Sequence, residues 1–280
     1  MSEIDYSSFL GREERRTEAI EAGPAIRLAL ALDFDDAPVG AGDALPNGWH
    51  WLMFPEAERA SFYTADGRGT RAGLLPDFAG LARMWAGGAF TFQRPLRIGQ
   101  TIVRQSRVTA IAPKSGRSGR LVVASVEHRL MGPTGEAVSE RQDLVFREPK
   151  PYAGAAEGER AALSPTWRRT IVPDEVLLFR ISALTYNSHR IHYDLRYAAE
   201  LEGYPGLLVH GPLSCLLLLD LIRRQVADKV LAQFEYRALR PLFCGNPLSV
   251  CGALTADDRI ATWIEDHEGY VAMRGSGGLG

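Results

Sequence analysis

The chain has 280 residues, a length that suits one large domain or two small ones. Its 32 basic and 34 acidic residues leave a net charge of −2. The chain therefore lacks the strong positive charge with which proteins bind nucleic acid or an acidic membrane surface. With 46% hydrophobic and 24% charged residues, the composition excludes a wholly disordered or fibrous protein.

The N-terminal residues are acidic and polar, with no basic segment followed by an apolar run, so we do not expect a secretory signal. The longest apolar run, Leu216–Leu219, is far shorter than the roughly 20 residues that span a bilayer. Cys215, Cys244 and Cys251 lack CxxC spacing, which indicates neither a disulfide framework nor a zinc site. These features predict a cytoplasmic protein with no membrane partner and no metal.

The first half of the chain contains a helix-compatible stretch at Phe78–Trp85, followed by a series of strand patterns. Strands are expected at Ala89–Gln93, Thr101–Ile111, Arg120–Met131 and Ser139–Arg147, with glycine-containing turn signals between the later ones.

The second half repeats this order. A predicted strand at Val176–Ile181 precedes a polar segment and a helix at Pro212–Val226, which has leucine on every side and is therefore expected to be buried. Further strands are expected at Phe234–Leu239, Leu248–Ala256, Arg259–Asp266 and Tyr270–Gly275.

A linker signature and an internal repeat divide the chain. The segment from Glu148 to Pro165 is rich in proline, alanine, glycine and glutamate. The motif R-P-L-x-x-G begins at Arg94 and again at Arg240, 146 residues later. Such a motif is also a common way to enter a strand, but its shared surroundings favour a duplicated fold. We predict an N-terminal domain at 1–150, a linker at 151–165 and a C-terminal domain at 166–280.

One helix enclosed by a curved antiparallel sheet, occurring twice, predicts an α+β chain with the double hot-dog fold. The two halves would join their sheets edge to edge and so remove exposed edge strands. Another α+β layer topology would give similar patterns.

The densest polar cluster lies at Ile181–Asp194, and Val209-His210-Gly211 leads into the apolar helix. Asn187 and His192, with the V-H-G that follows, resemble the acid–x4–His segment and V-H-G of the MaoC-like group of (R)-specific enoyl-CoA hydratases and 3-hydroxyacyl-thioester dehydratases. The form N-x-H-R-I-H-Y-D is most similar to a branch with mitochondrial-type dehydratases and bacterial hydratases of C5 dicarboxylyl-CoA esters (mesaconyl-C4-CoA, itaconyl-CoA). The similarity to the bacterial members extends over the chain and includes Gly48–Trp51 and Phe62–Thr64.

Hydration of an enoyl thioester needs residues of the types found here. The ordinary pKa of a histidine such as His192 lies near neutrality, so it can take and return a proton. The backbone N–H of Gly211, at the positive end of the helix, can receive the thioester oxyanion. Asn187 would hold the water. Because Asn187 replaces the commoner aspartate and an amide cannot shuttle protons, we expect His192 to act as the single acid–base group.

The other polar residues of the cluster have two interpretations each. His189 and Arg190 could bind a substrate carboxylate, or Arg190 could pair with Asp194 and brace the loop. Asp194 could assist His192, although carboxylates in such loops more often cap or brace. Tyr193 and His210 are candidates for substrate binding, and for His210 a purely structural role is the alternative.

The resemblance therefore implies a hydro-lyase acting on an enoyl-CoA or 3-hydroxyacyl-CoA ester, first a C5 dicarboxylyl ester and second a fatty-acid-type ester. CoA enters as part of the substrate, and no cofactor is expected. A thioesterase using Asp220 and a non-catalytic acyl-thioester-binding module are the alternatives. The first half lacks an Asn-x4-His copy, so we expect it to line the acyl and CoA tunnel. The pseudo-dimeric chains could form a homo-oligomer.

Overall fold

The computed structural model describes residues 6–34, 40–69, 73–78, 80–116, 119–154, 157–255 and 258–280. The helices and strands of the first half are β1 (Glu13–Ala19), α1 (Ala22–Ala31), β2 (Ala82–Phe92), β3 (Thr101–Gly116), β4 (Gly119–Gly132) and β5 (Gly135–Arg147). Short 3₁₀ helices lie at Ser7–Phe9, Trp49–Leu52 and Ala60–Phe62.

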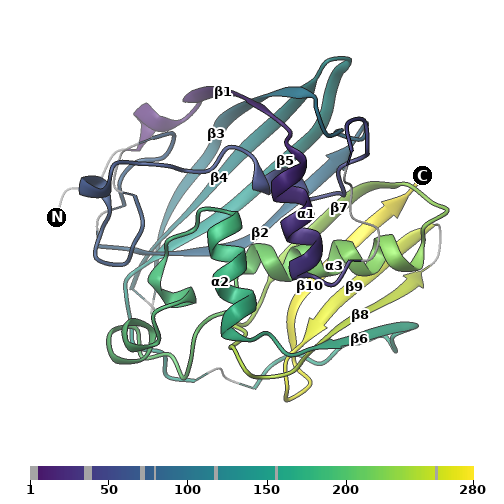
Figure 1. Cartoon of the computed structure of the whole chain (residues 1–280). Coiled ribbons are helices and arrows are strands. Elements are labelled where there is room, and N and C mark those ends of the chain that lie inside the picture. The colour runs from purple at the N-terminus through teal and green to yellow at the C-terminus, as the bar shows by residue number, and fades with distance from the viewer. Residues whose placement is uncertain are drawn as a thin grey trace.

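The second half repeats this succession (Figure 1). Its elements are β6 (Trp167–Ile171), α2 (Glu175–Leu184), α3 (Gly211–Gln225), β7 (Leu231–Ala238), β8 (Leu248–Thr255), β9 (Arg259–Glu265) and β10 (Val271–Leu279). A 3₁₀ helix at Arg190–His192 and a π-helix at Tyr197–Leu201 lie between α2 and α3. The described residues of the predicted linker form neither helix nor strand.

The strands form one antiparallel sheet in the order β1-β3-β4-β5-β2-β7-β10-β9-β8-β6. Each strand of the first half has its counterpart at the mirrored position in the second half, so a pseudo-twofold axis passes between β2 and β7. There Phe90 pairs with Phe234 and Gly88 pairs with Tyr236. This arrangement confirms the double hot-dog fold and the edge-to-edge joining of its sheets.

The repeated R-P-L-x-x-G motif has the same backbone role in both halves. The N–H of Arg94 donates to the carbonyl of Ala137 at 3.2 Å, and the N–H of Arg240 donates to the carbonyl of Ala272 at 3.1 Å. In each case the motif leaves the central strand and bonds to the outer neighbouring strand. The repeat therefore marks equivalent positions of one duplicated unit.

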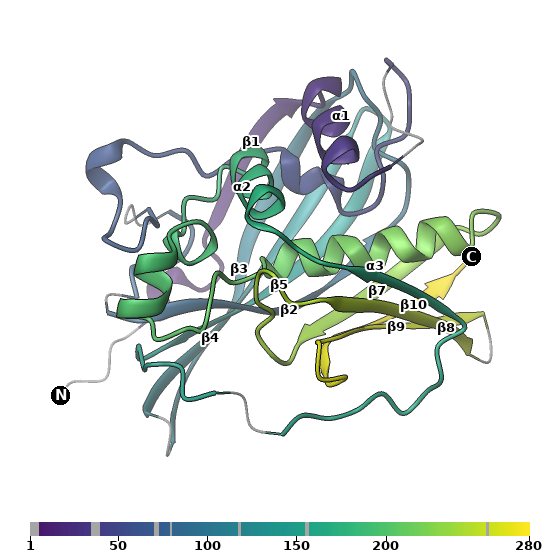
Figure 2. The same cartoon turned by 60° about the horizontal axis from the view of Figure 1, so that its bottom comes forward.

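The two faces of the sheet have different coverings. Ile260 and Ile264 of β9 belong to the main core, whereas Trp263 between them packs in a separate cluster with Ala161 of the linker. Because neighbouring side chains of a strand point to opposite faces, the linker covers the face opposite the core. Figure 2 shows the linker passing below the sheet and α3 lying above it.

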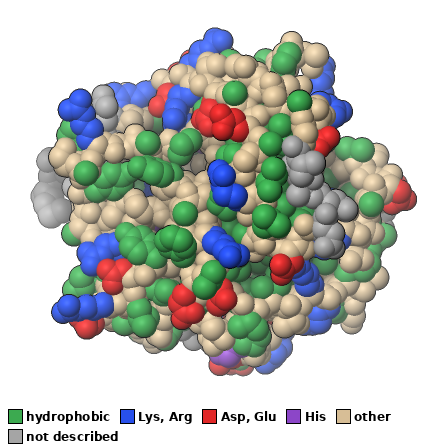
Figure 3. Space-filling model, viewed as in Figure 1, with side chains coloured by type: hydrophobic (Ala, Val, Ile, Leu, Met, Phe, Trp, Pro, Cys, Tyr) green, Lys and Arg blue, Asp and Glu red, His purple; other side chains and the backbone are tan. Residues whose placement is uncertain are grey.

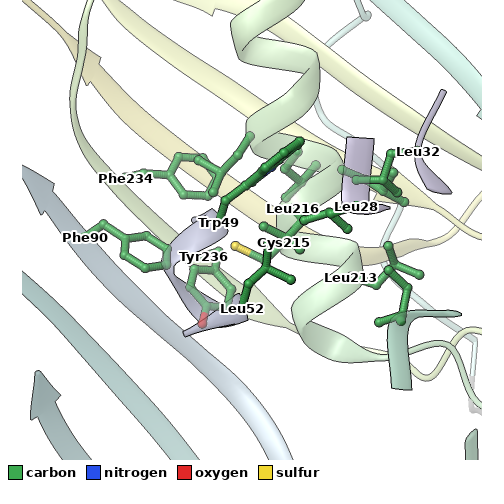
Figure 4. Packing of buried hydrophobic residues seen from close by; sticks show 14 of the residues in the cluster. Leu28, Leu32, Trp49, Leu52, Phe90, Leu213, Cys215, Leu216, Phe234 and Tyr236 are labelled. Atoms are coloured by element: carbon green, nitrogen blue, oxygen red, sulfur yellow. The ribbon is translucent and has the colours of Figure 1, made fainter. Parts of the chain in front are cut away.

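The predicted apolar helix is confirmed as α3, in which all residues from Leu213 to Ile222 are buried. Trp49, only 2% exposed, packs in the same core beside Leu216 and Tyr236 (Figure 4). Gly48 precedes it with φ +84°, and a Cβ there would lie 2.7 Å from Leu219 Cδ1. A glycine is therefore needed where this part of the first half meets α3.

The helix predicted at Phe78–Trp85 is wrong, because β2 begins at Ala82; residue 79 lies outside the described residues. None of the described residues of the first half forms a helix as long as α3. The 3₁₀ helix Trp49–Leu52 takes the equivalent place. The N–H of Leu45 donates to the carbonyl of Leu96 just as that of Val209 donates to Leu242 before α3.

The strand predicted at Val176–Ile181 is also wrong, because these residues belong to α2. A short continuous apolar run suits a buried strand or a helix equally well. Here the Asp174 carboxylate accepts a hydrogen bond from the N–H of Leu177 at 2.7 Å and caps the helix. The four strands predicted after α3 agree with β7, β8, β9 and β10 within a few residues, except that Ala256 lies outside the described residues. The elements β1, α1 and β6 were not predicted.

The face that carries α1 and α2 exposes several hydrophobic side chains beside Lys and Arg (Figure 3). Among them are Leu30 of α1 and Val176 and Phe179 of α2. In the part of the chain that the structure describes, no helix has the length and apolar character needed to cross a membrane.

Candidate active site

The polar cluster follows α2 and is shaped by a tight turn. Tyr186 has φ +53°, and the N–H of Asn187 returns to the carbonyl of Ser182 at 2.8 Å. The Asn187 Oδ1 accepts from the N–H of His189 at 3.1 Å, as in an Asx-turn. The carbonyl end of the Asn187 amide is therefore used by the backbone, and its NH₂ end remains to bind a ligand or water.

His192 is held as a neutral imidazole in one tautomer. Its Nδ1 lies 2.8 Å from the carbonyl oxygen of Leu208, so Nδ1 must carry the proton and donate it. Burial lowers the pKa of His192 to about 4, because its effect is larger than that of the Leu208 hydrogen bond, which raises the pKa. Nε2 thus carries a lone pair at neutral pH, and no hydrogen bond to the described residues occupies it. This nitrogen can act as a base.

The imidazole of His192 stacks on that of His210, with ring centroids 3.7 Å apart. His210 Nε2 lies 2.9 Å from Ser182 Oγ, whereas its buried Nδ1 has no hydrogen-bond partner among the described residues. Burial, followed by the charge of His192, lowers the pKa of His210 well below its usual range. Because His210 directly precedes α3, the stack places His192 beside the N-terminus of that helix.

Gly211 is the first residue of α3, where backbone N–H groups have no partner within the helix. A Cβ at Gly211 would lie only 3.1 Å from Cβ of Trp85 on β2. The indole of Trp85 donates from Nε1 to the hydroxyl of Tyr236 at 2.8 Å, which fixes its orientation. The start of α3 therefore faces an aromatic side chain from the first half of the chain.

A loop of the first half also holds the polar cluster. The N–H of Arg190 donates to the carbonyl of Asp66 at 2.9 Å, and Ser188 Oγ donates to that of Gly67 at 2.6 Å. Gly67 has φ +84°, and a Cβ there would overlap the carbonyl oxygen of Ser188. Sequence reasoning did not identify this loop, although the Asp66-Gly67 pair is a turn signal.

Arg190 and Asp194 bind each other. Nε and Nη2 of Arg190 donate to Asp194 Oδ2 at 2.9 and 2.7 Å, and Nη1 donates to the carbonyl of Ala65. The other Asp194 oxygen accepts from the N–H of Tyr197 at 3.0 Å. The Tyr197 hydrogen bond and then that of Arg190 hold the pKa of Asp194 below its usual value. This pair has the geometry of the bracing alternative.

His189 and Tyr193 belong to the same loop as the Arg190–Asp194 pair. Burial, then the charges of His192 and Arg68, lower the pKa of His189 to about 3. Its ring centroid is 5.7 Å from that of His192. Tyr193 is exposed and donates its hydroxyl to the carbonyl of Ser188 at 3.0 Å. The structure thus gathers the predicted residues Asn187, His189, His192, His210 and Gly211 at the start of α3, while Arg190, Tyr193 and Asp194 support the loop.

Asp220, the residue that a thioesterase would need, has a different environment. It is buried on α3, and its carboxylate accepts from Arg169 Nη1 at 2.7 Å and Arg224 Nε at 2.8 Å. Nine positions along the helix from Gly211 correspond to about 13 Å. Both oxygens of Asp220 are used by arginines at a distance from the histidine stack.

The described residues contain no group of three or more His, Cys, Asp and Glu side chains that could hold a metal ion.

Known proteins resemble this chain over most or all of its length. The family model for hydroxyacyl-thioester dehydratase type 2 matches residues 48–244. Mesaconyl-C(4)-CoA hydratase of Chloroflexus aurantiacus is 37% identical and covers 100% of both chains. The type 2 mitochondrial dehydratase of Schizosaccharomyces pombe is 28% identical over 79% of this chain and 83% of its own.

A MaoC-like dehydratase from Phytophthora capsici has a similar structure, with a TM-score of 0.68, 14% identity and 99% coverage of each chain. That likeness supports the fold, and the sequence matches support the chemistry. The chain is therefore a hydro-lyase and belongs to the family of type 2 hydroxyacyl-thioester dehydratases.

Proposed function

We propose that this protein reversibly hydrates a short enoyl-CoA ester that carries a second, free carboxylate, with His192 as its acid–base group. One observation carries the chemical part of this proposal: the imidazole of His192, with Nε2 unprotonated, stacks on His210 directly before the N-terminus of α3. A base and an oxyanion-binding N–H at one place are what addition of water to an enoyl thioester requires.

In the hydration direction, Nε2 of His192 removes a proton from water as the water oxygen bonds to Cβ. The electrons of the double bond move toward the thioester, and the N–H of Gly211 receives the charge on its oxygen. The NH₂ group of Asn187 holds the water. The imidazolium then returns its proton to Cα, which gives the 3-hydroxyacyl ester and restores His192.

Two substrate classes follow from the relatives. The 37% identical relative is named for mesaconyl-C(4)-CoA, which favours a C5 dicarboxylyl ester such as mesaconyl-C4-CoA or itaconyl-CoA. The more distant mitochondrial relatives are named for hydroxyacyl thioesters, so a fatty-acid-type ester is the second candidate.

We further propose a division of labour between residues 1–150, which line the acyl and CoA tunnel, and residues 166–280, which hold the catalytic groups, joined by the linker 151–165. The contacts of Trp85 and Gly67 with the catalytic segment support it. The free cysteines Cys215, Cys244 and Cys251 suit a cytoplasmic location. CoA enters only with the substrate, no other cofactor takes part, and the chains associate into a homo-oligomer.

The test is to incubate the protein with crotonyl-CoA, mesaconyl-C4-CoA and itaconyl-CoA while following enoyl absorbance and free thiol. We expect loss of absorbance and a hydrated product without free thiol, with the dicarboxylyl esters converted fastest. Free thiol without hydrated product would identify a thioesterase. Binding of the esters with no reaction would identify a non-catalytic module.

A further inference from the structure

We infer that Arg83 is a specificity-determining residue that binds the free carboxylate of the substrate. This inference rests on the proposed function and deepens it. In mesaconyl-C4-CoA the free carboxylate is attached to Cβ, the carbon that water attacks. A group that recognises it must therefore reach close to His192.

Arg83 has the required position. It lies on β2 two residues before Trp85, so both side chains point to the same face of the sheet, ahead of the irregularity between Trp85 and Gly87. Trp85 contacts the site of Gly211 on that face. The positive charge of Arg83 also acts on the histidines, where it adds to burial in lowering the pKa of both His189 and His192.

Two other arginines that the structure describes near the histidines, Arg68 and Arg190, already bind protein groups. Arg190 gives two N–H groups to Asp194 and a third to a backbone carbonyl. Arg68 donates from Nε to the carboxylate of Asp66 and from Nη2 to the carbonyl of Leu81. Neither guanidinium can turn to a substrate without breaking these bonds.

Arg83, in contrast, makes only a weak polar contact with the described residues. Its Nη1 lies 3.9 Å from an oxygen of Glu56, which is longer than a hydrogen bond, and the Glu56 side chain is 81% exposed. Exposed pairs of this kind contribute about 0–1 kcal/mol. The Arg83 side chain is itself 36% exposed, so a ligand can reach it and displace Glu56 at little cost.

A substrate carboxylate bound at this site needs a positively charged partner. The low pKa values of His189 (about 3) and His192 (about 4) leave both rings neutral at pH 7, so they cannot compensate a carboxylate brought among them. An unpaired carboxylate away from water is strongly unfavourable. The planar guanidinium of arginine matches a carboxylate with two parallel hydrogen bonds.

The test compares Arg83→Gln with the unaltered protein on two esters that differ in the carboxylate. For mesaconyl-C4-CoA we expect kcat/KM to fall about 100-fold, mainly through KM, because the carboxylate loses a charged partner. For crotonyl-CoA, kcat/KM should change less than about threefold. Arg83→Lys should restore part of the loss. Arg107→Gln removes a more exposed charge, also weakly paired with a glutamate, from β3; it is the control and should affect neither ester.

A binding measurement separates this inference from the proposed function. By calorimetry the unaltered protein should bind succinyl-CoA more tightly than butyryl-CoA, and Arg83→Gln should lose that preference. If the preference depends on Arg83 but no ester is hydrated, the proposed function fails and the carboxylate site stands. An equal fall for both esters, or no change for either, would overturn the role of Arg83 while hydration remained.

Discussion

The two halves of this molecule have equivalent strands but differ at the place where the central helix begins. After Val209 the second half continues with His210 and the fifteen residues of α3, which starts with Gly211-Pro212. After Leu45 the first half continues with Pro46-Asn47-Gly48 and a 3₁₀ helix of only four residues. One half thus begins a long helix at this place, while the other fills the equivalent place with the 3₁₀ helix that contains Trp49.

Each half also buries a histidine, and the two have opposite surroundings. Nε2 of His50 lies 2.8 Å from Glu140, whose carboxylate also accepts from Trp51 Nε1 at 2.8 Å and Gln142 Nε2 at 2.7 Å. Nε2 of His192 has no such partner among the described residues. Nε2 of the buried histidine is therefore hydrogen-bonded to a carboxylate in one half and accepts no hydrogen bond from the described residues in the other.

The largest expected effect is on turnover when the histidine of the second half is removed. His192→Ala should lower kcat about 10³- to 10⁴-fold, because it removes the single acid–base group. His50→Gln, which keeps a hydrogen-bond donor for Glu140, should change kcat less than about threefold and instead lower the melting temperature. Steady-state kinetics and thermal unfolding of both variants check this contrast. Near-normal turnover in His192→Ala would show that the chemistry lies elsewhere.

The second prediction concerns the support that the first half gives to the catalytic segment. Gly67→Ala should lower kcat about 100-fold, because the new Cβ must displace Ser188 and with it the turn that holds Asn187 and His192. Gly80 is a matched control: its φ of +75° is also positive, but no heavy atom lies within 4 Å of its Cβ position. Gly80→Ala should cost about 1–2 kcal/mol of stability from backbone strain and leave kcat unchanged. Equal losses of activity would mean that strain, and not contact with Ser188, is responsible.

The sequence predicted well where a pattern is local and strong. The leucine-rich helix α3 and the strands β3, β4, β5, β7, β8, β9 and β10 each follow from a pattern among neighbouring residues. The strand prediction at Val176–Ile181 was wrong because the apolar run suits a helix equally well, and the capping side chain of Asp174 favours the helix.

Other features depend on contacts between distant parts of the chain. Gly67 and Ser188 are 121 residues apart, and nothing near either one specifies the other. Trp85 was assigned to a helix, so its place opposite Gly211 could not be foreseen. The first half was expected to line the tunnel, but which of its residues reach the polar cluster follows only from long-range contacts, such as the pairing of β2 with β7 and the hydrogen bond between Gly67 and Ser188.

The third prediction tests the stabilising role of the buried pair in the first half. Burial alone would raise the pKa of Glu140, but the hydrogen bond and charge of His50 outweigh it and lower that pKa from 4.5 to about 2. A carboxyl group with a lowered folded-state pKa stabilises the protein above its unfolded-state pKa and loses that effect as the pH falls through the folded-state value. Glu140→Gln should therefore lower the free energy of unfolding by about 3 kcal/mol at pH 7, with kcat unchanged.

Urea unfolding at several pH values checks this role. The difference between the unaltered protein and Glu140→Gln should be constant above about pH 5 and shrink as the pH falls from 4.5 toward 2. A difference that does not depend on pH would mean that the loss comes from packing and not from the charge of Glu140.

The smallest expected effect is a flat region in the pH profile of activity, which sharpens the contrast between the two histidines. Because burial lowers the pKa of His192 to about 4, its unprotonated form still predominates at pH 5. As the pH falls from 8 to 5, kcat/KM for the preferred ester should change less than twofold, and it should drop about tenfold per unit only below pH 4. Circular dichroism at each pH separates this loss from acid unfolding. A loss of activity centred near pH 6.5, the ordinary pKa of histidine, would show that the base is not a buried imidazole fixed by Leu208 but one in contact with water.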